Sequence, residues 1–315
     1  MDLLALSKLG RFRSIVSVLF KYGFDDVAER LHLPGKILIS KTRMAVQEMT
    51  TWERLRHTLE ELGPTFVKFG QILSLRGDLL PAELIKELEK LQDSVAPVSF
   101  EEIMGVLQKA LKKPLEEIFS LIDEEPLAAG SLAQVHRAVL KDENVPVALK
   151  IRRPDIVRTV EVDLQILEGA APILCEHLEF ARTYDFVNLV KELKRALLRE
   201  LNFTLEARNM QIVSQALSGE KDVIIPEVYE DYTRFSVLTM DLIEGVKLKH
   251  LQPENVEERE QLAKIGIRLV VKQVLENGFF HADPHPGNFL VVNEREVCLL
   301  DWGVVGILPS ETRYE

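Results

Sequence analysis

HADPHPGNFLVVNEREVCLLDWG, residues 281–303, combines two aspartates, the amide of Asn288 and two histidines with two short apolar runs. The apolar runs, 289–292 and 297–300, flank a polar turn, a pattern that predicts a pair of strands. A hairpin of that length brings Asp301 back to the level of Asn288. The resulting oxygen-rich cluster suits Mg²⁺, which takes one or two carboxylates and leaves its other positions to phosphate and water.

The order of the polar groups is that of a kinase phosphotransfer site: His-x-Asp-x4-Asn, two strands, then Asp-x-Gly. In this layout Asp283 positions or deprotonates the phosphoryl acceptor, and Asn288 and Asp301 hold the metal. The stretch alone leaves two alternatives open. One is a turn with a few solvated acids, and the other is a metal-hydrolase site that uses His281, Asp283 and His285.

Composition places the chain among ordinary globular proteins. Its 315 residues are 46% hydrophobic and 28% charged, which allows two domains or one bilobal unit with an extension. The net charge of -11 argues against general nucleic-acid binding. The two cysteines, Cys175 and Cys298, form no CxxC motif, which predicts a reducing compartment and no structural zinc. No run approaches the ~20 apolar residues that a membrane span needs.

The first 45 residues are basic and carry apolar positions at helical spacing. They hold eight Lys or Arg against four acids. A basic amphipathic helix either lies on a membrane surface or packs against the protein, and packing is slightly favoured for the apolar face. The basic residues predict a preference for anionic lipid. A linker near 33–35 and a helix over 41–61 are expected next.

Pro64 is well placed to begin a helix. Lys68 and Gln71 are three residues apart and share one face of that helix. Gly70, between them, permits a close backbone approach. Two further helices are expected, over 82–92 and 99–111.

The pattern changes near residue 118, where three strands are expected, over 119–125, 132–140 and 145–152. The third strand contains Val-Ala-Leu-Lys, which matches the kinase strand whose lysine holds the α- and β-phosphates. Because side chains alternate along a strand, Lys150 lies with Ala148 on the face opposite Val147 and Leu149. The turn 128–131 stands where kinases carry a glycine-rich loop.

Two long helices are expected after the strands, over 155–178 and 185–217. On the second helix, Glu200 and Glu206 lie on well-separated faces, and Asn202 shares a face with Glu206. Residues 240–243 resemble the hinge that links two kinase lobes. The remaining expected elements are strands over 223–225, 229–232 and 235–242 and a helix over 257–277.

Six motifs occur in the order found in the UbiB family, also called ADCK or AarF-like: KFGQ (68–71), AAGSLAQVH (128–136), VALKIRRP (147–154), ELNFTLEARN (200–209), HADPHPGN (281–288) and DWG (301–303). The chain therefore resembles this family of atypical protein-kinase-like ATPases, which support ubiquinone and related isoprenoid-lipid metabolism. The resemblance covers essentially the whole chain. HADPHPGN together with Lys-x-Gly-Gln is highly specific.

The resemblance implies an α+β, bilobal protein-kinase-like fold in three parts. An N-terminal helical extension occupies 1–112, a small lobe with inserted helices occupies 113–244, and a large lobe begins at 245–315. The chain stops fourteen residues after Asp301, so the large lobe is expected to be incomplete. Exposed apolar surface is therefore expected over 265–300.

Carried over position by position, the resemblance makes Lys150 the phosphate-binding lysine and Glu206 its helix partner. Asp283 becomes the catalytic aspartate, and Asn288 and Asp301 become the Mg²⁺ ligands. The residues expected to bind ATP are Ala128, Ala129, Gly130, Ser131, Ala148, Lys150, Met240 and Ile243.

The resemblance also implies a gating set, formed by Lys68, Gln71, Glu200 and Asn202. Lys68 resembles the family lysine that pairs with the first acid of a Glu-x-Asp motif, here Glu200. Such a pair would hold helix 64–75 over the cleft and exclude protein substrates. Asn202 replaces the Asp of that motif, and Gly130 stands where Ala is common. Both departures bear on how tightly the nucleotide is restrained.

The first hypothesis is an enzyme that needs ATP and Mg²⁺ and acts in isoprenoid-quinone biosynthesis. It is expected in the cytoplasm, peripheral to the inner membrane, with any membrane span beyond residue 315. Its expected partners are an isoprenoid lipid or quinone precursor, the membrane surface and other quinone-biosynthesis proteins, but no nucleic acid. The alternatives are a small-molecule kinase of the aminoglycoside or choline type, which the helix with Lys68 argues against, and a non-catalytic lipid-binding scaffold, which the intact Lys150 and Asp301 argue against.

Overall fold

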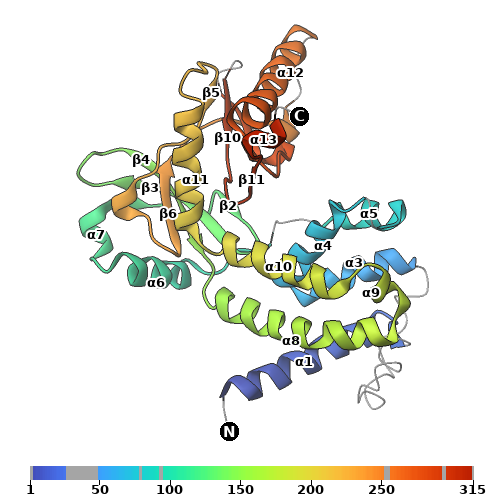
Figure 1. Cartoon of the computed structure of the whole chain (residues 1–315). Helices are drawn as coiled ribbons and strands as arrows, with labels where there is room; N and C mark the ends of the chain where they lie inside the picture. Colours follow the sequence, from blue (N-terminus) through green and yellow to red (C-terminus); the bar gives the residue numbers. More distant parts are fainter. Residues whose placement is uncertain are drawn as a thin grey trace. The chain divides into compact units, whose positions relative to one another are not determined.

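The computed structural model describes residues 3–25, 49–77, 80–91, 95–251, 256–292 and 296–313. The chain forms two compact units, and both are discontinuous in sequence (Figure 1). The first unit comprises Met1–Pro97, Ala129–Leu132 and Pro154–Leu198, and the second comprises Val98–Ala128, Ala133–Arg153 and Arg199–Glu315. The three-part division along the sequence stays a prediction.

The first unit is helical. Its helices are α1 (Leu3–Lys21), α3 (Thr51–Leu62), α4 (Pro64–Ser74), α5 (Ala82–Leu88), α8 (Ile156–His177), α9 (Glu179–Thr183) and most of α10 (Phe186–Glu200). Helices α1 and α8 run side by side (Figure 1). Arg11 of α1 binds Asp163 of α8 with Nε to Oδ1 at 2.6 Å, and it also donates to the carbonyl oxygen of Leu62. One guanidinium therefore joins three helices.

Helix α3 begins at Thr51 rather than at residue 41, so the expected start of this helix is wrong. The side chain of Thr50 accepts a hydrogen bond from the backbone of Glu53, and the Glu53 carboxylate accepts one from the backbone of Thr50. This reciprocal capping box satisfies the donors of a helix start. The expected linker near 33–35 lies outside the described residues.

Helix α4 begins at Pro64, as predicted. Gly70 sits where the helix meets its neighbours most closely. A Cβ atom built there would lie 2.2 Å from a methyl carbon of Leu91 and 2.9 Å from one of Leu59. Only glycine allows this approach, so the predicted close backbone contact is confirmed.

An antiparallel sheet in the order β1-β3-β4-β6 forms the centre of one half of the second unit, and the short β2 pairs with β3. The bounds are β1 (Phe119–Ile122), β2 (Ala128–Ala129), β3 (Ala133–Leu140), β4 (Pro146–Arg152) and β6 (Val237–Asp241). Val147 and Leu149 of β4 face a core shared with α6 (Phe100–Leu111), which α7 (Leu115–Ile118) extends. Ala148 belongs to a separate core on the other face, so the predicted alternation is confirmed.

That second core joins α11 (Phe203–Ala216) and α12 (Val256–Val271) to a second sheet and ends at the fully buried Trp302. The second sheet has the order β5-β10-β9-β7, with β5 (Val223–Ile224), β7 (Val246–Lys247), β9 (Phe289–Val292) and β10 (Glu296–Leu299). A separate pair joins β8 (Phe279–His281) to β11 (Val305–Ile307). The short remaining helices are η3 (Leu248–His250), η5 (Pro286–Asn288) and α13 (Ser310–Arg313).

The single helix expected over 185–217 is wrong, because it breaks between Glu200 and Phe203. The side chain of Asn202 accepts a hydrogen bond from the backbone of Thr204 at 3.1 Å, which caps a new helix. The backbone N–H of Phe203 leaves the helical pattern and donates to Phe235. Glu200 and Asn202 therefore do not share a continuous helix with Glu206, and the argument from their spacing does not hold.

Two smaller expectations are also corrected. Residues 229–232 do not form a strand, because Tyr232 turns back to Tyr229 and Glu230–Tyr232 form the 3-10 helix η2. The Thr239 hydroxyl donates to the Tyr232 carbonyl and fixes that turn. The helix over 257–277 changes at Lys272 into the π-helical segment η4 (Lys272–Asn277).

Helix α12 and η4 expose apolar side chains, as predicted for residues 265–300. Ile267 is 67% exposed, Val270 49% and Leu275 53%, whereas Leu269 is buried. None of the helices in the described ranges combines the length and apolar character that crossing a membrane requires.

Candidate functional site

Lys150 lies between two carboxylates in the second unit. Its Nζ atom is 2.8 Å from both carboxylate oxygens of Glu206 and 3.3 Å from Oδ1 of Asp301. Lys150 lies on β4, and Glu206 lies in the first turn of α11. Asp301 is the second residue after the end of β10. The predicted pairing of Lys150 with Glu206 is confirmed.

Electrostatic interactions within this cluster shift the pKa values of its members. Burial raises the pKa of Glu206 to about 7, with a further contribution from the Asp301 carboxylate included in that value and an opposing one from Lys150. Burial alone would lower the pKa of Lys150, but the carboxylates of Asp301 and Glu206 outweigh it and raise that pKa, so the ammonium stays charged. Lys150 therefore lies against two carboxylates that repel each other. An added divalent cation would relieve that repulsion.

The hairpin places Asn288 beside this cluster. Leu299 pairs with Phe289 across β9 and β10, and the backbone of Leu300 donates to the Asn288 carbonyl at 2.8 Å. The strand pair predicted from the two apolar runs is confirmed, although its turn at 293–295 lies outside the described residues. The Asn288 amide nitrogen donates to the carbonyl of Asp283 at 3.1 Å, which turns the amide oxygen away from that carbonyl. Amide and carboxylate oxygens are suitable Mg²⁺ ligands.

His281 organises the loop that carries Asp283. Its Nδ1 accepts a hydrogen bond from the Asp283 backbone at 3.1 Å, and its Nε2 lies 3.1 Å from the Leu300 carbonyl, to which it donates in this tautomer. The imidazole also meets the edge of Trp302 at 4.8 Å between ring centres. Both ring nitrogens bind backbone, so His281 serves the loop rather than a metal.

The metal-hydrolase alternative fails on the same geometry. His285 uses its Nδ1 to accept from the backbone of Gly287. In the described ranges no three His, Cys, Asp or Glu side chains are grouped to hold a metal ion. Asp283 is exposed on the loop, where it can reach an incoming acceptor.

Part of the expected nucleotide surface lies on the Lys150 face. Ala148 of β4 and Met240 of β6 are directly opposite in the strand register and belong to the same buried cluster. Ile243 follows β6 and is half-buried. Ala128 lies in β2 of the second unit, whereas 129–131 belong to the first unit, so contact of this turn with a nucleotide stays a prediction.

A family model described as the ABC1 atypical kinase-like domain matches residues 90–315. The chain belongs to the ABC1 family. It is 36% identical to the "Probable protein kinase UbiB" of Vibrio parahaemolyticus over 98% of this chain and 58% of that protein. It is also 36% identical to "Protein ACTIVITY OF BC1 COMPLEX KINASE 3, chloroplastic" of Arabidopsis thaliana, over 82% of this chain and 37% of that protein.

A solved structure of another protein supports the fold. The Rv3197 protein of Mycobacterium tuberculosis, solved in complex with erythromycin, matches with a TM-score of 0.57 at 24% identity. The match covers 80% of this chain and 63% of that one. The family and the kinase-like α+β fold that the motifs predicted are thus confirmed. The chain spans 37% to 58% of the length of the two curated relatives named above.

The residues expected to gate the site lie on separate elements. Lys68 and Gln71 are on α4, Glu200 ends α10, and Asn202 caps α11. The Gln71 amide donates to the Leu91 carbonyl at 3.4 Å, so it contributes to packing within the first unit. Because Lys68 and Glu200 belong to different units, their contact stays a prediction.

Sequence reasoning missed two amides that contact the segments expected to form the active site. Gln273 is buried in η4, and its side-chain oxygen accepts the backbone N–H of His281 at 2.8 Å. A π-helical turn reorients a side chain by inserting a residue, and such turns are frequent at functional sites. The side chain of Asn209, the last residue of ELNFTLEARN, donates to the Trp302 carbonyl at 2.8 Å. A glutamine within an apolar helix was the available signal for Gln273.

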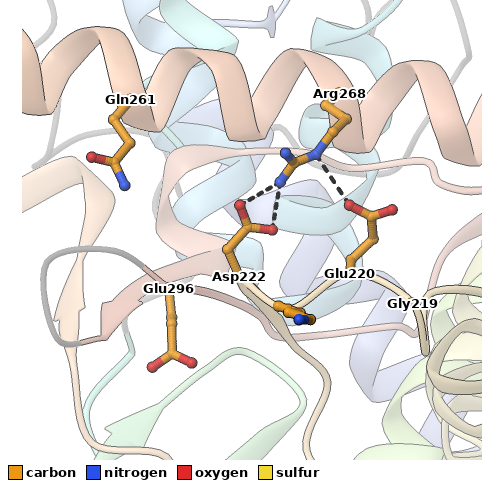
Figure 2. Close-up of a pocket in the computed structure, with 7 residues that line it drawn as sticks. Gly219, Glu220, Asp222, Gln261, Arg268 and Glu296 are labelled. Atoms are coloured by element: carbon orange, nitrogen blue, oxygen red, sulfur yellow. Dashed lines mark hydrogen bonds and ion pairs between the residues drawn. The ribbon is translucent and has the colours of Figure 1, made fainter.

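A cavity of about 610 Å³ lies elsewhere in the second unit, where the connection from α11 to β5 meets α12 (Figure 2). Three of the charged side chains that line it bind one another, because Arg268 contacts Glu220 at 3.1 Å and also pairs with Asp222. Lys272 pairs with Glu220 as well. These ion pairs fasten α12 to the connection that follows α11, and none of the residues that line the cavity is a predicted catalytic residue.

Proposed function

We propose that this chain binds ATP with Mg²⁺ and hydrolyses it, as an atypical kinase-like ATPase that supports ubiquinone or related isoprenoid-quinone biosynthesis. The observation that carries the proposal is the convergence of Lys150 with the carboxylates of Glu206 and Asp301 on one face of the sheet. Membership of the ABC1 family supports nucleotide binding. The quinone step rests on the resemblance of the motifs to the UbiB family.

Each residue has a defined part in the proposed reaction. Lys150, oriented by Glu206, binds the α- and β-phosphates, as in kinases. Asn288 and Asp301 would hold Mg²⁺, which would supply positive charge to neutralise the phosphates. Asp283 orients or deprotonates the attacking water or hydroxyl from its exposed position on the loop.

ATP hydrolysis is better supported than phosphorylation of other proteins. The proposed pairing of Lys68 with Glu200 would hold α4 over the cleft where a protein substrate docks, and Asn202 would keep a hydrogen-bonding group there without the charge. An isoprenoid lipid or quinone precursor at a membrane surface is the proposed partner. The basic residues of the first 45 positions would favour anionic lipid by about 1 kcal/mol each near the surface.

The test is ATP turnover with and without Mg²⁺, anionic liposomes and phenolic quinone precursors. Asp301→Asn keeps the shape of the side chain and removes one negative metal ligand. We expect this variant to lose Mg²⁺-dependent ATP binding by at least ~10-fold, since the lost ligand is charged. Asp231→Asn, an exposed acid of η2, is the matched control.

Three results would count against the proposal. Asp301→Asn that binds Mg-ATP as wild type does, with the same thermal shift, would remove the metal assignment. Rapid phosphorylation of casein, at the rate of ATP turnover, would contradict the gating argument. Lipid binding without any nucleotide effect would favour the scaffold alternative.

A further inference from the structure

Asp301 adopts a backbone conformation that needs support from its surroundings. Its φ is 57°, in the left-handed region that residues other than glycine rarely occupy. Such a conformation persists only where neighbouring contacts enforce it. The next residue, Trp302, is fully buried, and its indole N–H donates to the Leu299 carbonyl at 3.2 Å. The side chain of Trp302 is therefore fixed, but its peptide carbonyl needs a partner of its own.

Asn209 supplies that partner from α11. Its side-chain nitrogen donates to the Trp302 carbonyl at 2.8 Å. Asn209 follows Glu206 by three residues, so the two side chains lie on the same face of the helix. One face of α11 thus contacts two of the segments that form the cluster. Glu206 binds the lysine of β4, and Asn209 binds the backbone immediately after Asp301.

We propose that Asn209 is a positioning residue for the metal ligand Asp301. By holding the Trp302 carbonyl, its amide fixes the peptide group between Trp302 and Gly303, which restrains the backbone beside Asp301 and keeps the carboxylate directed toward Lys150. The inference rests on the proposed binding of Mg-ATP and adds a residue to which that proposal gives no role. It also makes the metal site sensitive to α11, because a displacement of this helix would move the contacts of Glu206 and Asn209 together.

Other contacts hold α11 in place when the Asn209 amide is removed. The connection that follows α11 is tied to α12 by the pairing of Glu220 and Asp222 with Arg268 (Figure 2). The strand that follows, β5, runs parallel to β10, and the backbone of Val297 donates to the Asp222 carbonyl at 2.9 Å. Variants at Asn209 are therefore expected to fold, with their defect confined to the turn at Asp301.

The first measurement is the Mg²⁺ concentration that gives half of the ATP-dependent rise in melting temperature. Asn209→Leu keeps a similar volume without a donor, and Asn209→Gln restores a carboxamide on a longer side chain. We expect Asn209→Leu to raise the half-saturating Mg²⁺ concentration at least ~5-fold, the effect of one lost hydrogen bond to the carbonyl. Asn209→Gln should recover part of this loss. Gln215→Ala, an exposed amide on the same helix, is the control.

The second measurement needs no ligand. The chain has two tryptophans, Trp52 and Trp302, so in a Trp52→Phe background the fluorescence reports on Trp302 alone. We expect Asn209→Leu to increase quenching of Trp302 by acrylamide, while Gln215→Ala leaves it unchanged.

The two measurements separate failure of the inference from failure of the proposed function. If Asn209→Leu matches Gln215→Ala in both Mg²⁺ dependence and quenching, the positioning role is wrong, whatever the function. If the wild-type protein shows no Mg²⁺-dependent response to ATP, the proposed function fails and the positioning of a metal ligand fails with it. Altered quenching in that case would leave Asn209 only a role in holding the turn.

Discussion

Each unit of the molecule contains a buried ion pair, and these two pairs differ in what surrounds them. In the first unit Asp163 is fully buried and binds Arg11 through both carboxylate oxygens, at 2.6 and 3.0 Å. The Nη2 atom of that guanidinium also donates to a backbone carbonyl. In the second unit Lys150 binds Glu206, with 4% of that side chain exposed, and also meets Asp301, which is 49% exposed.

The comparison shows which property distinguishes a candidate active site. Burial and ion pairing are common to both, so neither identifies function. The Arg11 pair is balanced in charge and uses the planar fork of arginine to fix helices. In the Lys150 cluster one ammonium meets two carboxylates, and that of Asp301 is half exposed. Two neighbouring carboxylates with access to solvent are an arrangement that a ligand can complete.

The largest effect on stability is expected from breaking the pair of Arg11 and Asp163. Arg11→Met leaves the Asp163 carboxylate buried without its cation, which should lower the free energy of unfolding by about 3–5 kcal/mol. Chemical denaturation measures this, with Arg13→Met on the exposed face of the same helix as the control. Replacing both partners, as Arg11→Met with Asp163→Leu, should recover most of the loss. A cost below ~1 kcal/mol for Arg11→Met would show that the pair does not hold the helices.

An intermediate and pH-dependent effect on stability is expected at the cluster of Lys150, Glu206 and Asp301. The pKa of Glu206 is raised from 4.5 to about 7 in the folded protein, so the stability that this group contributes is complete below pH ~4.5 and is lost as the pH rises through ~7. Glu206→Gln does not titrate. Without metal or nucleotide, the variant should therefore gain stability relative to wild type between pH 5 and pH 8, by on the order of 1–3 kcal/mol.

Thermal or chemical unfolding at the two pH values measures this difference, and Glu117→Gln, at an exposed position of α7, is the control. If the stability difference between Glu206→Gln and wild type falls as the pH rises, Glu206 is stabilised as an anion, and the argument from burial and repulsion between the carboxylates is wrong.

The smallest effect is expected where charges pair at the surface. Arg268 is 50% exposed beside Glu220 and Asp222, so Arg268→Ala should cost no more than ~1 kcal/mol. Raising the salt concentration to ~1 M should reduce this cost, because exposed pairs are screened. Urea unfolding at low and high salt tests both points. A cost above ~2 kcal/mol that salt does not change would show that this network stabilises the fold as a buried ion pair does.

The parts predicted correctly from sequence are those that local patterns determine. Alternation along β4 places Lys150 on the face opposite Val147 and Leu149. The two apolar runs of the hairpin determine the position of Asp301. The break between α10 and α11 was missed because Asn202 was interpreted only as a lost charge in a motif. Asn is also a strong helix cap, and its bond to Thr204 decides the break here.

Other features depend on contacts between distant segments and leave little local signal. The turn at Tyr232 is fixed by a hydroxyl from β6, and the contact of Asn209 with Trp302 joins residues far apart in the chain. Among the proposed gating residues, sequence spacing gave a false relation between Asn202 and Glu206. The Lys68–Glu200 pair remains a prediction from family resemblance.

Parallel pairing of β5 with β10 has a consequence for the order in which the chain folds. The sheet with Lys150 and the helix with Glu206 are complete once residue 241 has been synthesised, whereas β5 must wait for β10 (Glu296–Leu299). Pairings between distant segments form slowly, since the intervening loop must first be closed. During synthesis the Lys150–Glu206 pair is therefore expected to close first, and the third charge arrives with Asp301 as a late step of folding.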